Sequence, residues 1–341
     1  MIRAVVFQLR AYHKEVFVAT TVFSILAVLG YLLILSSRSY TTMNNHGESV
    51  PNLADRPNNK SANGAHNPSE SRHKILCWIT TSDATKNRLQ GVQDTWGPRC
   101  DKILYVAATA TNVNDVNRSH VTVETGTLLR VPSKELYRDL KRKTYYAIKH
   151  LYENYAQEYG WFFKCDDDTY VIMENLRRFL QNYSPDVLHY FGCEQRVGVM
   201  YNSGGGGYVL SRAALQKLGE TVLPKLTAAN LRDQNQAEDI WIARLLLQIG
   251  VRSEKTVAAD GRYRFLPMNP EHLINRETMP AKYNWFPNIA KYTVHPGTRC
   301  CSPEAITFHY LSPAQMRTLD YFLYEVGPMI HEWNSDKQQN R

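Results

Sequence analysis

The sequence predicts an α/β fold in which a parallel or mixed sheet lies between layers of helices. Short apolar runs typical of buried strands, such as ILCWITT (75–81) and KILYVAA (102–108), alternate with segments of helical periodicity. Across residues 135–155, apolar side chains recur at helical spacing while Lys and Arg occupy the other face. Strands that alternate with helices in this way favour a sheet covered by helices.

The remaining predicted elements continue this alternation in chain order. The further strand candidates are VTVET (121–125), WFFKC (161–165), HYFGC (189–193), GGYVLS (206–211) and ITFHYL (306–311). The further helix candidates are MENLRRFLQNY (173–183) and AEDIWIARLLLQIG (237–250). The second of these has acidic residues in its first turn and Gly250 at its end, as helix termini favour.

The N-terminal part of the chain predicts a membrane anchor. Residues 16–35 carry no charge, and as a helix they would span roughly 30 Å, the thickness of a bilayer core. Three basic residues precede the run and only Arg38 closely follows it, which predicts a cytosolic tail over 1–15 and a translocated remainder. A cleaved signal peptide is the alternative, but the run is too long and lacks a cleavage site. We therefore expect a single-pass type II membrane protein.

The segments beyond the anchor differ sharply in composition. Residues 36–73 are rich in Asn, Ser, Pro, Gly and His, which predicts a flexible luminal stem. Apolar density returns at about 74 and persists to 330, long enough for one large catalytic domain, and 331–341 form a C-terminal tail. Three Asn-x-Ser acceptors for N-glycosylation agree with a luminal chain; these are Asn59, Asn117 and Asn182.

The net charge and the cysteines restrict the class of protein. The charge of +8 comes from scattered basic residues, and a secretory topology keeps the domain from nucleic acid. All six cysteines follow the predicted anchor, where the environment is oxidising. Cys77 and Cys100 flank one strand–loop–strand unit and are the first candidate disulfide. The adjacent Cys300 and Cys301 form either a vicinal bridge or bonds to two different partners.

Three adjacent aspartates, Asp166, Asp167 and Asp168, end the strand WFFKC. Their carboxylates repel one another and resist burial, and no cation follows closely enough in sequence to pair with them. In open α/β sheets, ligands bind beyond the carboxyl ends of the strands. A solvated acidic turn is one interpretation, and a carboxylate clamp for a hard divalent cation is the other.

Spacing argues against three other uses of the triplet. A calcium loop of the EF-hand type would need Gly and Glu where Val171 and Arg177 stand. A phosphatase with an aspartyl nucleophile would need Thr or Val in place of Tyr170, and the Asp-Thr-Gly loop of aspartic proteases is absent. The remaining interpretation is the Asp-x-Asp device of nucleotide-sugar glycosyltransferases.

Three other segments carry residue types that such a metal and ligand site would use. The loop NSGGGGYVLS (202–211) lets the backbone approach a ligand closely, although glycine clusters also simply form turns. Glu238 and Asp239 open a helix, where acids also stabilise the macrodipole. His309 lies on the opposite strand face from its apolar neighbours, where a structural role is the usual alternative.

These segments together resemble the core 1 β1,3-galactosyltransferase (glycoprotein-N-acetylgalactosamine 3-β-galactosyltransferase) family over about residues 74–327. The motifs occur in the family's order: TW-x-x-RC, KTYYAIKHLYENY, WFFKCDDDTYVIMENLR, YFG, SGGGGYVLS, the Glu-Asp helix start, CCS and TFHY. The resemblance implies a GT-A-like fold with a central mixed, mostly parallel sheet. It also implies a Golgi enzyme whose catalytic domain is luminal.

The resemblance assigns expected roles residue by residue. It implies Asp239 as the catalytic base and Asp166, Asp168 and His309 as ligands of Mn²⁺. Donor contacts are expected from Lys143, Asp166 and Asp167. Acceptor contacts are expected from Trp285, Tyr292, Gly205 and Glu238. Cys165 and Cys193 both follow strands near this site and are the second candidate disulfide.

The activity implied is inverting transfer of galactose from UDP-galactose to the 3-hydroxyl of GalNAc that is O-linked to Ser or Thr. The partners are then UDP-galactose, GalNAc-bearing glycoproteins and the membrane, and a homodimer is an open alternative for the assembly. A non-catalytic, chaperone-like relative is a competing interpretation, but that branch lacks the aspartate clamp that this chain keeps. A β1,3-transferase with another donor or acceptor is the third.

Overall fold

The computed structural model describes one part of the chain, namely residues 74–109, 123–125, 127–134, 136, 139–227, 230–231, 236–275, 277 and 281–328. The predicted tail, anchor and stem lie outside these residues, as do 331–341. The chain divides into two compact units, 1–64 and 65–341, and every described residue belongs to the second. Within the described part, no helix is both long and apolar enough to cross a membrane.

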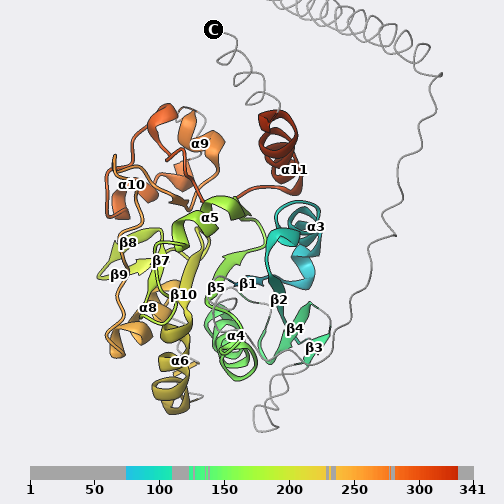
Figure 1. Ribbon diagram of the computed structural model, residues 1–341, viewed down its shortest axis with the longest axis vertical. Coiled ribbons are helices and arrows are strands. Elements are labelled where there is room, and N and C mark those ends of the chain that lie inside the picture. The colour runs from blue at the N-terminus through green and yellow to red at the C-terminus, as the bar shows by residue number, and fades with distance from the viewer. Residues whose placement is uncertain are drawn as a thin grey trace, which may run out of the picture. The chain divides into compact units, whose positions relative to one another are not determined.

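A seven-stranded sheet forms the centre of the described residues (Figure 1). Its order is β3-β4-β2-β1-β5-β10-β7. The strands are β1 (Ile75–Thr80), β2 (Lys102–Ala108), β3 (Val123–Thr125), β4 (Leu128–Val131), β5 (Trp161–Asp166), β7 (Tyr190–Gly192) and β10 (Tyr208–Ser211). Strands β4, β2, β1 and β5 pair in parallel, whereas β3, β10 and β7 each join by antiparallel pairing. The predicted mixed sheet is confirmed, and most of its strands run in one direction.

Two smaller sheets flank the central one. One contains β6 (Tyr170–Val171), β11 (Phe265–Leu266) and β12 (Thr307–Phe308), with β12 between the other two. The other is a hairpin of β8 (Glu194–Val197) and β9 (Val199–Asn202), which turns at Gly198 with φ +70°. Because β6 directly follows the aspartates and β12 directly precedes His309, their pairing brings two distant segments of sequence together.

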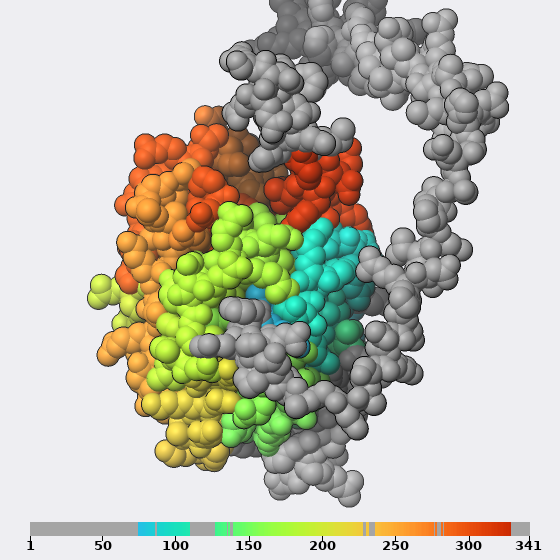
Figure 2. Space-filling model, in the orientation of Figure 1, coloured from blue at the N-terminus to red at the C-terminus, as the bar shows by residue number. Residues whose placement is uncertain are grey.

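The helices cover both faces of the central sheet. The longer ones are α3 (Lys86–Asp94), α4 (Leu140–Tyr155), α5 (Met173–Leu180), α6 (Arg212–Thr221), α8 (Glu238–Gln248) and α11 (Pro313–Tyr321). The short ones are α9 (Pro270–Ile274), α10 (Phe286–Ile289), η1 (Asp83–Thr85), η2 (Gly97–Arg99), η5 (Leu223–Lys225), η7 (Ala281–Tyr283), η8 (Gly297–Arg299) and the π-helix η9 (Phe322–Val326). Figure 2 shows α5 on the surface beside the segments around α3 and α11.

Alternation along the strands creates two hydrophobic cores. In β1, Leu76 and Trp78 pack with α4, α6 and α8, whereas Cys77 and Ile79 pack on the opposite face with α3, α5 and α11. Successive side chains of a strand point to opposite faces, so a strand buried on both sides must be apolar throughout. That is why β1 reads as a continuous apolar run and β5 is apolar except for Lys164, up to its end at Asp166.

Several predicted boundaries differ from the observed ones. The helix predicted over 135–155 begins at Leu140, and the strand predicted over 306–311 ends at Phe308. Tyr310 has φ +62°, in the left-handed region, so the chain cannot continue there as an extended strand. His309 therefore stands at a turn rather than inside a strand.

The disulfides confirm one pairing prediction and contradict another. Cys77 is bonded to Cys100, and Cys300 and Cys301 form the vicinal bridge. The predicted Cys165–Cys193 pair is wrong, because both cysteines are free and buried. Strand β10 lies between β5 and β7, which places their backbones about 9–10 Å apart, beyond the reach of a disulfide.

Candidate active site

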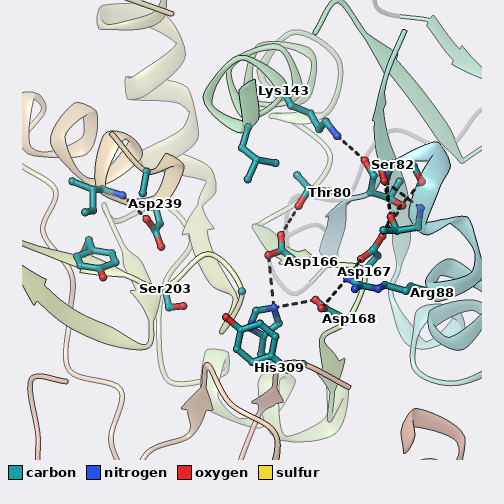
Figure 3. Close-up of a pocket in the computed structure, with 18 of the residues that line it drawn as sticks. Thr80, Ser82, Arg88, Lys143, Asp166, Asp167, Asp168, Ser203, Asp239 and His309 are labelled. Carbon is teal, nitrogen blue, oxygen red and sulfur yellow. Dashed lines mark hydrogen bonds and ion pairs between the residues drawn. The ribbon is translucent and has the colours of Figure 1, made fainter. Parts of the chain in front are cut away.

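A pocket of about 610 Å³ opens beyond the carboxyl ends of β1 and β5, where the sequence predicted a site. Among the residues that line it are Asp166, Asp167, Asp168, Asp239 and His309. Figure 3 shows the three aspartates and His309 on one side of the pocket, with Asp239 and Ser203 on the other. The structure thus brings the predicted metal ligands and the predicted base into one cavity.

Asp166 is the last residue of β5 and is held by the neighbouring strand. Its register partner in β1 is Thr80, whose hydroxyl donates to Asp166 Oδ1 at 2.5 Å. The Lys164 ammonium donates to the same oxygen at 2.7 Å. Burial alone would raise the pKa of Asp166, but Lys164, His309 and the Thr80 hydroxyl together lower that pKa to about 2. Asp166 is therefore a fixed anion whose Oδ2 remains directed toward His309, 3.9 Å from Nε2.

Asp167 points away from the other two carboxylates, toward η1 and α3 (Figure 3). Its Oδ2 accepts hydrogen bonds from the Thr81 hydroxyl at 2.8 Å and the Thr85 hydroxyl at 2.5 Å. Burial raises the pKa of Asp167, and these two hydrogen bonds oppose that rise. Asp167 therefore anchors the turn after β5 to the segment after β1.

Asp168 and His309 form the closest contact between the predicted metal ligands. His309 Nε2 lies 3.0 Å from Asp168 Oδ1, and Asp168 Oδ2 accepts from the Arg88 guanidinium at 2.9 Å. One ligand atom from each of Asp166, Asp168 and His309 can be chosen so that all lie within 4.8 Å of one another. Two carboxylates and an imidazole are a donor set that suits a divalent cation such as manganese. The residues present therefore fit a metal ion.

The glycine-rich loop makes room for His309. A Cβ atom on Gly205 would lie 2.1 Å from His309 Cε1, much closer than any real contact. The carbonyls of this loop are fixed by hydroxyls from both sides of the site. Thr169 donates to the Gly205 carbonyl at 2.8 Å, and Thr307 donates to the Gly206 carbonyl at 2.5 Å. Gly205 is thus required by the close approach of the imidazole.

Asp239 stands in the first turn of α8 and faces the same pocket. Its Oδ2 accepts from the Gly204 backbone N–H at 3.2 Å, and its Oδ1 accepts from the Ile240 N–H at 2.9 Å. Burial raises the pKa of the Asp239 carboxyl, and the two backbone donors oppose the rise. A positioned carboxylate with a raised pKa has the properties of a general base.

Glu238, a predicted acceptor contact, lies behind the pocket and is not among the residues that line it. Its Oε1 accepts from the hydroxyls of Thr144 and Tyr208, both at 3.0 Å. Its Oε2 lies 3.8 Å from the Lys164 ammonium, and burial raises the pKa of this carboxyl. Lys164 therefore connects Glu238, the Gly204 carbonyl at 3.3 Å and Asp166 in one buried network.

Of the other predicted donor and acceptor contacts, some line the pocket and some do not. Lys143 lines the pocket from α4 and donates to the Thr81 carbonyl at 2.6 Å. Trp285 also lines it, whereas Tyr292 does not. The Tyr292 hydroxyl donates to buried Glu194 at 2.9 Å, so this ring holds the β8–β9 hairpin.

Several polar residues of the site were missed from the sequence, among them Lys164, Arg88 and Gln195. Lys164 could have been found, because residues two apart in a strand share a face and Lys164 precedes Asp166 by two. Arg88, which pairs with Asp167 and Asp168, and Gln195, which lines the pocket, gave no local signal. Both reach the pocket only through the tertiary fold.

Comparison with known proteins places the chain among glycosyltransferases. Residues 71–259 match the Fringe-like family model. The glycoprotein-N-acetylgalactosamine 3-beta-galactosyltransferase 1 of Xenopus laevis is 34% identical over 256 residues, which are 74% of this chain and 67% of that protein. Human chondroitin sulfate glucuronyltransferase is 31% identical over 106 residues, 30% of this chain and 13% of that protein.

Solved structures show a more distant likeness. The galactosyltransferase LgtC in complex with donor and acceptor sugar analogs is 15% identical, with a TM-score of 0.37 over 70% of this chain and 88% of that chain. The decisive findings are the match to the family model and the length over which the Xenopus laevis protein is similar. This chain belongs to the Fringe-like family of glycosyltransferases, alongside the glycoprotein-N-acetylgalactosamine 3-beta-galactosyltransferases.

Proposed function

We propose that this chain is an inverting β1,3-galactosyltransferase that moves galactose from UDP-galactose to the 3-hydroxyl of GalNAc O-linked to Ser or Thr. The observation that carries the proposal is that the Asp166–Asp168–His309 cluster and the Asp239 carboxylate share one pocket. Family membership and the name of the amphibian relative support the same activity.

Asp166, Asp168 and His309 would hold the metal ion, for which we propose Mn²⁺. When bound, the ion would neutralise the charge that develops on the departing UDP. Lys143 lies on the same side of the pocket as this cluster and would contact the donor (Figure 3). Asp167 would act indirectly, because its hydrogen bonds to Thr81 and Thr85 fix the turn that carries Asp168.

Asp239 would accept the proton of the acceptor hydroxyl as its oxygen attacks the anomeric carbon. The backbone donors of Gly204 and Ile240 orient the carboxylate, and burial raises its pKa toward the range useful for a base at neutral pH. Attack opposite the leaving UDP inverts the anomeric centre, so an α-linked donor gives a β-linked product. Trp285 would provide an apolar face for the acceptor ring.

The test is a transfer assay with the purified full-length chain, Mn²⁺, a panel of UDP-sugars and a GalNAc-α-peptide. We expect galactose transfer that is abolished in Asp168→Ala and in Asp239→Asn. Asp260→Asn is the matched control, because Asp260 is exposed and pairs with Arg262 outside the pocket. If the wild-type chain leaves UDP-galactose intact with this acceptor, the proposal is wrong.

We also propose that the enzyme is a single-pass type II protein of the Golgi membrane with its catalytic domain in the lumen. The support is the uncharged run 16–35 with its basic N-terminal flank, together with the Asn-x-Ser acceptors. Asn182 is exposed at the end of α5, whereas Asn59 and Asn117 lie outside the described residues. A luminal domain predicts sensitivity of the cellular protein to an endoglycosidase and protection from protease in intact vesicles.

A further inference from the structure

The side-chain amide nitrogen of Gln195 is buried and lacks a geometric hydrogen-bond partner in the part of the chain that the structure describes. Gln195 belongs to β8, and its exposed fraction is 1%. The Cys193 thiol lies beside the amide but is at most a weak acceptor. Buried amides are nearly always hydrogen-bonded, because desolvation without a partner is costly. An amide kept in this state therefore points to a partner that arrives with the substrate.

The side chain of Gln195 belongs to the pocket face of the hairpin. Gln195 pairs with Tyr201 across β8 and β9, and both line the pocket, as expected for directly opposed residues that share one face. The neighbouring residue Glu194 points to the other face, where Lys291 donates to it at 2.7 Å and Tyr292 also donates to it. This buried anchor holds the strand in place, so the amide is presented by a fixed support.

The surroundings of Gln195 fit the acceptor rather than the nucleotide. The strand that pairs with that of Gln195, β9, packs against α8 and leads into Ser203, so Gln195 belongs to the side of the pocket that carries Asp239 and Ser203. In Figure 3 that side lies across from Arg88 and Lys143, the cations that line the pocket in the described part. Apolar side chains of Trp285, Ile240 and Ile289 line the same pocket. An aromatic ring, aliphatic groups and one neutral amide suit an uncharged sugar that carries a polar substituent.

We propose that Gln195 is a specificity-determining residue that hydrogen-bonds the acetamido group of the acceptor sugar. A carboxamide offers a donor and an acceptor, which complements the carbonyl and N–H of an acetamido substituent. A sugar with a hydroxyl at that position would leave the buried amide poorly satisfied, and such sites reject incomplete ligands strongly. This inference rests on the proposed function, since it names how that reaction would recognise its acceptor.

The experiment compares two peptides that differ only in carrying α-linked GalNAc or α-linked galactose, with the full-length chain, Mn²⁺ and UDP-galactose. In Gln195→Met we expect kcat/KM for the GalNAc peptide to fall about 10- to 100-fold, while that for the galactose peptide changes little. The KM for UDP-galactose should stay at its wild-type value. Because the Gln195 Nε2 has no neighbour stronger than the weakly accepting Cys193 thiol among the described residues, the thermal midpoint should fall little. Gln195→Asn, which keeps the amide but is too short, should lose the preference for GalNAc as well.

Gln216→Met is the control, because the Gln216 amide donates to the Ala156 carbonyl outside the pocket. It should leave the preference for GalNAc over galactose unchanged. A Gln195→Met variant that keeps this preference, or that loses both acceptors equally, would overturn the inference while leaving the proposed function intact. A wild-type chain that transfers galactose to neither peptide would instead refute the proposed function, and the inference with it.

Discussion

Substituting Gly205 tests whether the exact place of His309 matters to metal binding. In Gly205→Ala the new Cβ would lie 2.1 Å from His309 Cε1, 2.4 Å from Nδ1 and 2.6 Å from Nε2. Non-bonded carbon atoms prefer about 3.5–4.0 Å, so the imidazole would have to retreat by roughly 1.5 Å. The room for this retreat is limited, because the Tyr310 ring stacks on the imidazole with centroids 3.8 Å apart.

The displacement sets the size of the expected effect. Nε2 now lies 3.0 Å from Asp168 Oδ1, and a movement of this size would separate the two ligand atoms or misalign the ring. Changes that disturb the support of a metal ligand typically cost 10- to 100-fold in affinity, about 1.4–2.7 kcal/mol. We therefore expect Gly205→Ala to weaken Mn²⁺ binding by about this factor and to lower kcat/KM for galactose transfer by at least as much.

A double-mutant cycle identifies His309 as the route of the effect. Mn²⁺ affinity is measured by titration for wild type, Gly205→Ala, His309→Ala and the double variant. With the imidazole absent, the added methyl group has room, so Gly205→Ala should cost less than about threefold in the His309→Ala background. Gly198→Ala is the control, since nothing lies within 4 Å of its new Cβ; its φ of +70° strains this variant's backbone, whereas Gly205 does not have a positive φ.

The geometric argument is refuted if Gly205→Ala binds Mn²⁺ within threefold of wild type. It is also refuted if the two substitutions prove additive, because the methyl group would then act through something other than His309. Gly198→Ala should bind Mn²⁺ within threefold of wild type, because its backbone strain lies away from the imidazole.

Three further predictions concern Asp239, Lys164 and the Cys77–Cys100 disulfide. Asp239→Asn should lower kcat by about 10²–10⁴-fold. Because burial raises the pKa of Asp239, wild-type activity should be lost on acidification at a higher pH than it would be with an ordinary aspartate as the base, and a pH–rate profile measures this. Lys164→Met should destabilise the fold by about 3 kcal/mol or more in chemical denaturation, because it leaves Asp166 without its cation. Replacing Cys77 and Cys100 by Ser should lower the free energy of unfolding by about 2–4 kcal/mol. Mild reduction that leaves this bond intact should leave wild-type activity unchanged.

The parts of the fold that were predictable from the sequence are those set by local pattern. The run 102–108 is β2 residue for residue, and the run 75–81 differs from β1 by one residue. Both strands are buried on two faces, so their apolar runs are continuous and their ends are marked by polar residues. Asp166 lies at a strand end for the same reason, which made the edge of the sheet predictable as the place of a site.

What the sequence did not reveal depends on the packing of distant elements. The Cys165–Cys193 pairing failed because the order of β5, β10 and β7 in the sheet cannot be read from spacing alone. Arg88 reaches the aspartates because η1 and the start of α3 lie against the turn after β5, a relation with no signature in the chain. Gln195 was missed because what distinguishes it is an Nε2 without a hydrogen-bond partner among the described residues, and this is visible only in the folded structure.

The partners of the three aspartates explain why the cluster can persist in a folded chain and still bind a cation. Lys164 pairs with Asp166 and also faces Glu238, and Arg88 pairs with Asp167 and Asp168, so the carboxylates outnumber the cations and negative charge remains. A fully neutralised cluster would have little attraction for a divalent ion, whereas three uncompensated carboxylates would repel one another in a partly buried site. This residual charge gives attraction for the ion but leaves part of the ion's charge unbalanced. The phosphates of a nucleotide sugar supply that balance, so the ion and the donor should bind more tightly together than either does alone.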